Sequence, residues 1–293
     1  MNIDLHIHSR DCSDGKMRLA DIFREAEKRN IQLISISDHD AVECQETAAE
    51  LAAEHGIHYL SGVELNITFS HPAYREEKPI PLDVLGYNYD IQNRALREKT
   101  HQLREYRTMR AKKILDNINE ELLKEKKVPM TKGDVKAIEE SVDGAFGRPH
   151  IANYMVKKGI VTTKQEAFDR YLVKCNVPKL PVSLEEASAL IHEAGGKLML
   201  AHPNDPNGTS LVSLTSAIRE QLEIIKTTML PYLDGIECFH SRLTEETTSA
   251  YLAFAREEGL MVTGGSDCHQ QPVIMGTVAV PDFVARQFGI NAE

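Results

Sequence analysis

Strand-like and helix-like segments alternate through most of the chain, and this alternation limits the folds that it can adopt. Short β-rich runs are followed by segments whose apolar residues recur at helical spacing, as at Leu19, Ile22 and Phe23. The predicted strands are residues 2–8, 32–38, 57–68, 81–89, 197–203, 235–239, 261–267 and 275–281. The predicted helices between them are residues 17–30, 42–56, 183–196, 210–229 and 245–258. Repeated strand–helix–strand units favour an α/β fold with a parallel sheet or barrel.

The alternation stops after Asp90 and resumes near Ser183. The helical patterns in between are residues 93–127, 131–141, 148–159 and 163–173. We therefore predict a barrel domain formed by residues 1–92 and 183–293, interrupted by a helical insertion subdomain at 93–182.

Charge is also distributed unevenly between these parts. Of the chain's 34 basic and 44 acidic residues, residues 94–182 hold 20 and 12, although the whole chain has a net charge of −10. The carboxylates of the acidic body could bind cations, and the basic segment could face an anionic substrate. The alternative for most of these lysines is a solvated helical surface.

The five cysteines are Cys12, Cys44, Cys175, Cys238 and Cys268, and none forms a C-x-x-C pair. We interpret them as free thiols in a reducing cytoplasm, which predicts a cytoplasmic protein. No apolar run approaches the ~20 residues that a membrane helix needs, and the N-terminus lacks the pattern of a signal peptide. We expect no membrane association, and the sequence indicates no obligate protein partner.

Polar residues that can bind metals follow many of the predicted strands. In chain order they are His6 and His8; Asp38, His39 and Asp40; Glu64; His202; Glu237 and His240; and Asp267 and His269. Loops after the carboxyl ends of parallel strands form one rim, so these side chains should converge. A His/Asp/Glu set without cysteine suits Zn²⁺, Mn²⁺ or Fe²⁺, and its size suggests more than one ion. Period-two spacing puts His6 and His8 on one face of a strand, and Asp14 would reach the site from the next loop.

Each of these residues also has an ordinary structural explanation. A single histidine in a strand is usually structural, Asp38 or Asp40 could be a helix N-cap, and Asp267 could be a turn residue. The recurrence at five or more junctions argues against these explanations as a set. The histidines without such placement are treated as ordinary, namely His55, His58, His71, His101 and His192.

The motifs DLHIHS…SDG, SDHD, GVE, AHP and GSDCH, in this order, resemble the PHP (polymerase and histidinol phosphatase) family of metal-dependent phosphoesterases. The resemblance covers essentially the whole chain. GRPHIA and AGGKLMLAHP are similar to the branch of 3′,5′-nucleotide bisphosphate phosphatases and 5′-3′ exoribonuclease-type proteins. The resemblance to the PHP family implies a distorted (β/α)₇ barrel with a helical insertion and a trinuclear metal centre.

The resemblance also implies which residues hold the ions. They are His6, His8, Glu64 and Asp267 for one ion; Asp14, His39 and His269 for another; and His202 and Asp83, with Glu64 as a bridge, for a third. The family usually has histidine where this chain has Asp83. Aspartate could weaken that ion, shift it towards manganese or magnesium, or alter the substrate range. We therefore expect two or three divalent ions, Mn²⁺, Fe²⁺ or Zn²⁺.

The expected chemistry is hydrolysis of a phosphate ester. Two ions about 3.5–4 Å apart can activate a hydroxide for in-line attack on phosphorus. Arg148 and His150, from the GRPH motif, would bind phosphate, because the arginine fork matches two phosphate oxygens. The alternative for Arg148 is a salt bridge at a helix start. His240 would contact substrate or protonate the leaving group, and the alternative is an ordinary rim histidine.

The expected substrate is a small phosphorylated metabolite, such as a nucleotide with a 3′-phosphate. The sequence leaves open whether short RNA is also a substrate. One alternative is a cyclic phosphodiesterase or a phosphatase acting on a sugar phosphate. Another is a barrel that binds nucleic acid without catalysis, which the basic insertion favours. Two observations argue against the non-catalytic barrel. Only the Asp83 position departs from the family pattern, and the aromatic content is only 6%, with no tryptophan to stack on bases.

Overall fold

The computed structural model describes residues 1–140 and 147–291 of the chain. It divides into two compact units: residues 1–100 with 181–293, here called the barrel unit, and residues 101–180, called the insertion unit. Helix α3 (Arg94–Lys124) begins in the first and continues into the second. The subdomain boundaries that we propose from the sequence, 92/93 and 182/183, place the whole of α3 in the insertion. Ser141, the end of the helix predicted at 131–141, lies outside the described residues.

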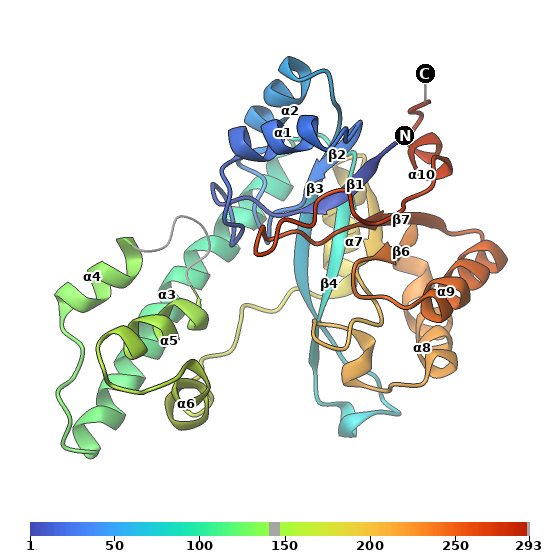
Figure 1. Cartoon of the computed structure of the whole chain (residues 1–293). Helices are drawn as coiled ribbons and strands as arrows, with labels where there is room; N and C mark the ends of the chain where they lie inside the picture. The colour runs from blue at the N-terminus through green and yellow to red at the C-terminus, as the bar shows by residue number, and fades with distance from the viewer. Residues whose placement is uncertain (141–146, 292–293) are drawn as a thin grey trace. The chain divides into compact units, whose positions relative to one another are not determined.

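The barrel unit is built on a seven-stranded sheet whose order follows the sequence (Figure 1). The strands are β1 (Ile3–Ile7), β2 (Leu33–Ile36), β3 (His58–Phe69), β4 (Ile80–Tyr87), β5 (Lys197–Leu200), β6 (Gly235–His240) and β7 (Met261–Gly265). Beyond the end of β7, Cys268 returns to the end of β1. The backbone N–H of His8 donates to the Cys268 carbonyl at 3.2 Å, and the N–H of Cys268 donates to the His6 carbonyl at 3.3 Å. The nearly closed barrel that the sequence predicts is confirmed.

One strand runs against the parallel direction that the strand–helix–strand pattern favours. β4 runs antiparallel to both β3 and β5, whereas the other neighbours are parallel. The reason is the connection: β3 and β4 are joined by residues 70–79, which contain only the short turn Arg75–Glu77. A parallel pair needs a longer crossover, usually a helix. The antiparallel register puts Asp83 opposite Asn66, two positions along β3 from Glu64.

The helices of the barrel unit use the apolar faces that the sequence indicates. α1 (Leu19–Lys28) and α2 (Gln45–Glu54) follow β1 and β2, and α1 buries Ile22 and Phe23 completely against Ile34 of β2 and its neighbours. The remaining helices are α7 (Leu184–Glu193), α8 (Ile218–Ile224), α9 (Glu245–Glu258) and α10 (Phe283–Gln287). Burial of these apolar faces drives the strand–helix packing.

The insertion unit contains helices and no strand in its described residues. Besides most of α3 it contains α4 (Lys132–Glu140), α5 (Arg148–Lys157), α6 (Lys164–Ala167) and a wider π-helical turn at Phe168–Leu172. Its core is apolar and includes Ile114, Ile118 and Met155, none of which is exposed. The insertion unit therefore has a hydrophobic core of its own.

Two predicted elements of the barrel unit are wrong in detail. Residues 275–281 form no strand, because β1 and β7 already pair and the N–H of Gly276 donates instead to the Asp4 carboxylate at 2.8 Å. The helix predicted at 210–229 is broken into a turn at Leu211–Ser213, α8 and a π-helical turn at Ile225–Met229. The Ser210 hydroxyl caps the first turn and Thr215 accepts from the N–H of Ala217, so hydroxyls compete with continuous helix here. Within residues 1–140 and 147–291, no helix has the length and apolar character to cross a membrane.

Candidate metal centre

A histidine pair at the end of β1 forms the base of the site. His6 and His8 are both completely buried, and both side chains point to the same side because they are two residues apart. Gly265 of β7 is required for this packing, since a Cβ at that position would lie 2.4 Å from the Cβ of His6. The glycine therefore allows the last strand to approach the first closely enough to close the barrel around the two imidazoles.

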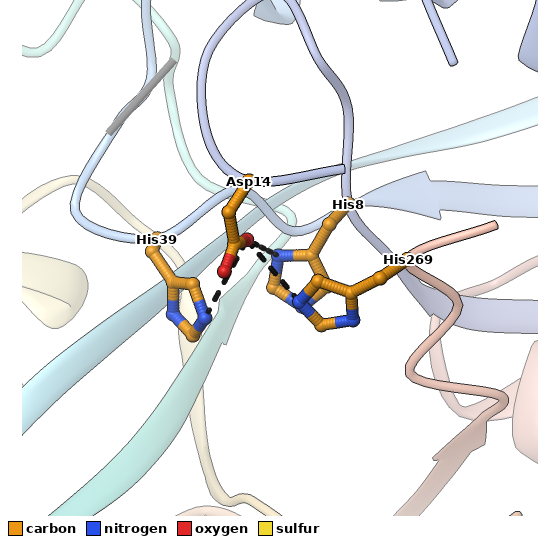
Figure 2. A group of neighbouring side chains, drawn as sticks. All are labelled: His8, Asp14, His39 and His269. Atoms are coloured by element: carbon orange, nitrogen blue, oxygen red, sulfur yellow. Dashed lines mark ion pairs between the residues drawn. The ribbon is translucent and has the colours of Figure 1, made fainter. Parts of the chain in front are cut away.

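Asp14 and three histidines form the more open half of the site (Figure 2). Oδ1 of Asp14 lies 3.2 Å from Nε2 of His269, 3.9 Å from Nε2 of His39 and 4.0 Å from Nδ1 of His8. One donor atom from each of the four residues lies within 4.8 Å of the others, which is a distance that a shared ion can span. Because the Asp14 side chain is 39% exposed, this half of the site faces solvent.

Glu64 and Asp267 form the buried half of the site with His6, His8 and His202. Glu64, 1% exposed, has its oxygens 3.0 Å from Nε2 of His202, 3.3 Å from Nε2 of His8 and 3.5 Å from Nε2 of His6. Oδ1 of Asp267 lies 3.2 Å from Nε2 of His8 and 3.6 Å from Nε2 of His6. Glu64 also reaches Nδ1 of His39 at 2.8 Å, so this carboxylate connects the two halves.

Ten non-glycine residues of the described chain have positive φ angles, and three of them lie at or beside the site. Asp40, His202 and Asp267 adopt positive φ angles of 49°, 24° and 54°. Non-glycine residues rarely adopt such angles, and residues held in them concentrate at functional sites. The strained residues follow three different strands, so the surrounding barrel determines their positions.

Asp83 is the residue that departs from the family pattern. Its carboxylate lies 4.0 Å from Nε2 of His202 and accepts a 2.6 Å hydrogen bond from the Asn66 side chain. Burial and the nearby Glu64 raise the pKa of Asp83 to about 6. Asp83 thus lies beside His202 and Glu64, and its role as a ligand stays a prediction.

Hydrogen bonds fix which nitrogen of two histidines faces the site. Nδ1 of His6 meets the Glu237 carboxylate at 3.0 Å, and Nδ1 of His269 meets the Asp267 carbonyl at 3.1 Å. Because both partners can only accept, each contact places the proton on Nδ1 and leaves the lone pair of Nε2 for the site. Metal-binding histidines usually have such a partner on the outer nitrogen.

The carboxylates of the site favour positive charge close to them. Burial opposes protonation of His39, but Glu64 and Asp14 outweigh it and raise the pKa of His39 to about 10. The pKa of His202 rises to about 9, because Glu64 overcomes the effect of burial there too. For His8, burial and the neighbouring His269 and His39 lower the pKa to about 4. A site that stabilises positive charge and keeps one imidazole neutral suits divalent cations.

Unpaired polar atoms support the same conclusion. Buried side-chain atoms without a hydrogen-bond partner include Nε2 of His6, Nε2 of His8, Oδ1 of Asp14, Oε2 of Glu64 and Nδ1 of His202. Buried polar atoms are costly without partners, so their convergence needs an explanation. An ion or ions held by these nitrogens and oxygens would satisfy them, and the donor set suits Mn²⁺, Fe²⁺ or Zn²⁺.

His240 lies at the same site but differs from the other histidines. Its Nδ1 accepts a 3.2 Å hydrogen bond from the backbone N–H of Arg242, so the neutral ring carries its proton on Nε2. That Nε2 lies 3.7 Å from Oδ2 of Asp267. His240 therefore presents an N–H group to the site, which fits a hydrogen-bond donor to substrate better than a metal ligand.

The sequence analysis missed the roles of Arg242 and Glu237. Arg242 lies 2.6 Å from the buried Asp205 and 3.6 Å from Oδ2 of Asp267, with 43% of its side chain exposed. Glu237, completely buried, joins His6 to the backbone N–H of His202. The position of Glu237 at a strand end was visible in the sequence. Arg242, by contrast, pairs with Asp205 from a distant loop, so no local sequence pattern indicates its role.

Arg148 and His150 belong to the insertion unit. The Arg148 guanidinium lies 5.7 Å from the Phe168 ring centroid, and Nδ1 of His150 accepts a 3.3 Å hydrogen bond from the N–H of Gly147. Phosphate binding by this pair stays a prediction.

The expectation of five free thiols is wrong for two of them. Cys12 and Cys44 form a disulfide with Cα atoms 6.2 Å apart, while Cys175, Cys238 and Cys268 are free and buried. Sequence spacing did not indicate the pair, because 32 positions separate the two cysteines and only the packing of α1 and α2 loops brings them together.

Comparisons with known proteins agree with this geometry. The family model of the PHP domain matches residues 4–172, and the chain belongs to this family. It is 27% identical to a 5′-3′ exoribonuclease of Haemophilus influenzae, over 91% of this chain and 89% of the relative. It is 26% identical to the 3′,5′-nucleoside bisphosphate phosphatase of Chromobacterium violaceum, over 92% and 87%. A solved structure from Bifidobacterium adolescentis, described as a metal-dependent phosphoesterase, matches with a TM-score of 0.75 and 28% identity over 99% of this chain and 96% of that one.

Proposed function

We propose that this chain, a metal-dependent phosphoesterase of the PHP family, removes phosphate from a small phosphorylated nucleotide such as a 3′,5′-bisphosphate. The convergence of His6, His8, Glu64 and Asp267 in a buried, acidic and incompletely hydrogen-bonded site is the observation that carries the proposal. When bound, divalent ions supply Lewis acidity towards phosphate oxygens and lower the pKa of water.

The surrounding residues divide the remaining work of hydrolysis. Glu237 orients His6, and Asp267 is flanked by His240 and Arg242. As a water oxygen bonds to phosphorus and the ester P–O bond breaks, the proton released by that water goes to the departing ester oxygen, which accepts a hydrogen bond from Nε2–H of His240. Arg242, held by Asp205, offers its remaining N–H groups to a phosphate oxygen. Arg148 and His150 contact a second phosphate in this proposal.

A phosphate-release screen with Mn²⁺ supplied tests the substrate class. The panel contains nucleoside 3′,5′-bisphosphates, mononucleotides, cyclic ribose phosphates and sugar phosphates, and we expect the highest kcat/KM on the bisphosphates. His8→Ala and Asp267→Asn should abolish release without unfolding the chain, while His58→Ala, an exposed histidine of β3, should retain it. Wild-type turnover in either site variant would refute the mechanism.

Leaving groups of different basicity test His240. His240→Gln should lower kcat strongly on nucleotides but little on p-nitrophenyl phosphate, whose leaving group needs no proton. An equal loss on both substrates would reassign His240 to structure. Arg242→Met and Arg148→Ala should mainly raise KM for phosphorylated substrates, and an unchanged KM would remove each from phosphate binding.

Short RNA is a second candidate substrate. It is favoured by similarity to the Haemophilus influenzae exoribonuclease and by the basic character of residues 94–182. A 5′-phosphorylated oligoribonucleotide, followed by gel analysis at two salt concentrations, separates this activity from release of phosphate from mononucleotides.

A further inference from the structure

We propose that the Cys12–Cys44 pair is a redox-sensitive tether that sets the affinity of the open half of the metal centre. Cys12 lies in the loop after β1, two residues before Asp14, and Cys44 lies five residues after His39, directly before α2. The disulfide therefore joins the two loops that carry these candidate ligands. The proposal rests on the candidate metal centre and does not depend on the substrate class.

A second connection ties the same two loops on the buried side. Asp38, completely buried, accepts hydrogen bonds from the N–H of Ser9 at 2.7 Å, the hydroxyl of Ser9 at 2.6 Å and the hydroxyl of Ser13 at 2.6 Å. The N–H of Cys12 in turn donates to the Ser9 hydroxyl at 3.2 Å. These hydrogen bonds hold the start of the segment that contains Asp14. The disulfide adds a restraint at Cys12, two residues before Asp14.

Asp14 depends on these restraints more than the other acidic ligands do. Its side chain is 39% exposed, whereas Glu64 is 1% and Asp267 is 9% exposed. Glu64 lies within β3 and Asp267 directly follows β7, so the barrel itself holds them. Loss of the tether should therefore weaken the ion bound by Asp14, His39 and His269 while the buried half, with Glu64 and Asp267, keeps its affinity.

The bond also includes the most exposed of the described cysteines. Cys44 is half-buried, whereas Cys175, Cys238 and Cys268 are buried thiols. A dithiol can reduce the bond: its thiolate attacks Sγ of Cys44, the S–S bond breaks, and Cys12 leaves and takes up a proton. The second thiol of the reductant then releases Cys44, so the reductant ends as a disulfide and the protein gains two thiols.

Mn²⁺ binding to the full-length chain tests the proposal without any phosphate substrate. Oxidised protein, protein reduced with a phosphine that is then removed, and the Cys12→Ser/Cys44→Ser double variant are titrated while free Mn²⁺ is followed by electron paramagnetic resonance. We expect the weaker of the Mn²⁺ dissociation constants to rise about 10- to 100-fold in the reduced protein and in the double variant, as for loss of other supporting contacts. The tighter constant should change little.

Controls separate the tether from a general effect of reduction. Cys175→Ser, in the insertion unit, should keep the response to the phosphine, and the double variant should have none. Superimposable isotherms for oxidised and reduced wild-type protein, with peptide mapping showing the bond present in one and absent in the other, would overturn the proposal. Failure of the nucleotide screen would leave this result unaffected, because Mn²⁺ alone is the probe.

Discussion

The barrel and insertion units differ in how completely their buried polar side chains are hydrogen-bonded. In the insertion unit, Asp134 is buried but bonded to Thr131, Tyr154 and Lys158. In the barrel unit, buried ring nitrogens and carboxylate oxygens of the site lack hydrogen-bond partners. Every side-chain atom identified as buried and unpartnered in the described residues belongs to the barrel unit.

This difference separates groups that stabilise the fold from groups kept for chemistry. A buried carboxylate with complete hydrogen bonding adds to local stability, whereas one left incompletely bonded has a desolvation cost. The barrel offsets that cost with an apolar core around its strands. The site should therefore respond to ions, and the insertion should respond to packing alone.

Among single substitutions, the largest effect on stability should come from the insertion core. Ile118→Ala removes a completely buried side chain and should lower the free energy of unfolding of the insertion unit by about 2–5 kcal/mol. Hydrogen exchange of residues 101–180 measures this change, with the exposed Met109→Ala as a control. Mn²⁺ affinity should stay constant; a parallel fall would show that the two units are energetically coupled.

Removal of divalent ions should destabilise the barrel unit and leave the stability of the insertion unit unchanged. If each ion is present at 100 times its dissociation constant, chelation should cost the barrel unit about 2.7 kcal/mol per ion. Exchange should accelerate in peptides from β1, β3 and β7 and stay unchanged in α4 and α5. Equal protection with and without ions would contradict the role assigned to the unpaired atoms.

A somewhat smaller effect is expected from the carboxylate behind His6. Glu237→Ala removes the partner of Nδ1 and should weaken Mn²⁺ binding about 10- to 100-fold. Isothermal titration checks this value, and Glu257→Ala, an exposed residue of α9, is the matched control. Unchanged affinity in Glu237→Ala would assign Glu237 to fold stability only.

Helix caps should give the smallest effects and should act within one unit each. Ser183 caps α7 of the barrel unit and Thr163 caps α6 of the insertion unit, each by accepting a backbone N–H. Replacing either by alanine should cost about 1 kcal/mol. Segment-resolved hydrogen exchange should find the loss in the unit that carries the substitution; a loss spread over both would argue against separate units.

The sequence was sufficient for the features that depend on local pattern. Apolar spacing in α1 and the polar residues in or after β1, β2, β3 and β7 predicted a parallel sheet or barrel and the convergence of His6, His8, Glu64 and Asp267. The direction of β4 was also open to prediction but was missed, since the predicted strands 57–68 and 81–89 leave no helix between them for a parallel crossover. The Cys12–Cys44 bond and the Arg242–Asp205 pair depend instead on distant segments, whose proximity no local pattern encodes.

The pairing of the first and last strands has a consequence for biosynthesis. Ser266 donates to Asp4, 262 positions earlier, and the His6 and His8 side chains face Asp267 across the same junction. The insertion core, by contrast, is complete once residue 180 has left the ribosome. A nascent chain whose β7 is still inside the ribosome can already contain the folded core of the insertion unit. It then has only part of the set of candidate metal ligands. Tight capture of divalent cations would then mark the moment at which translation has passed the last strand.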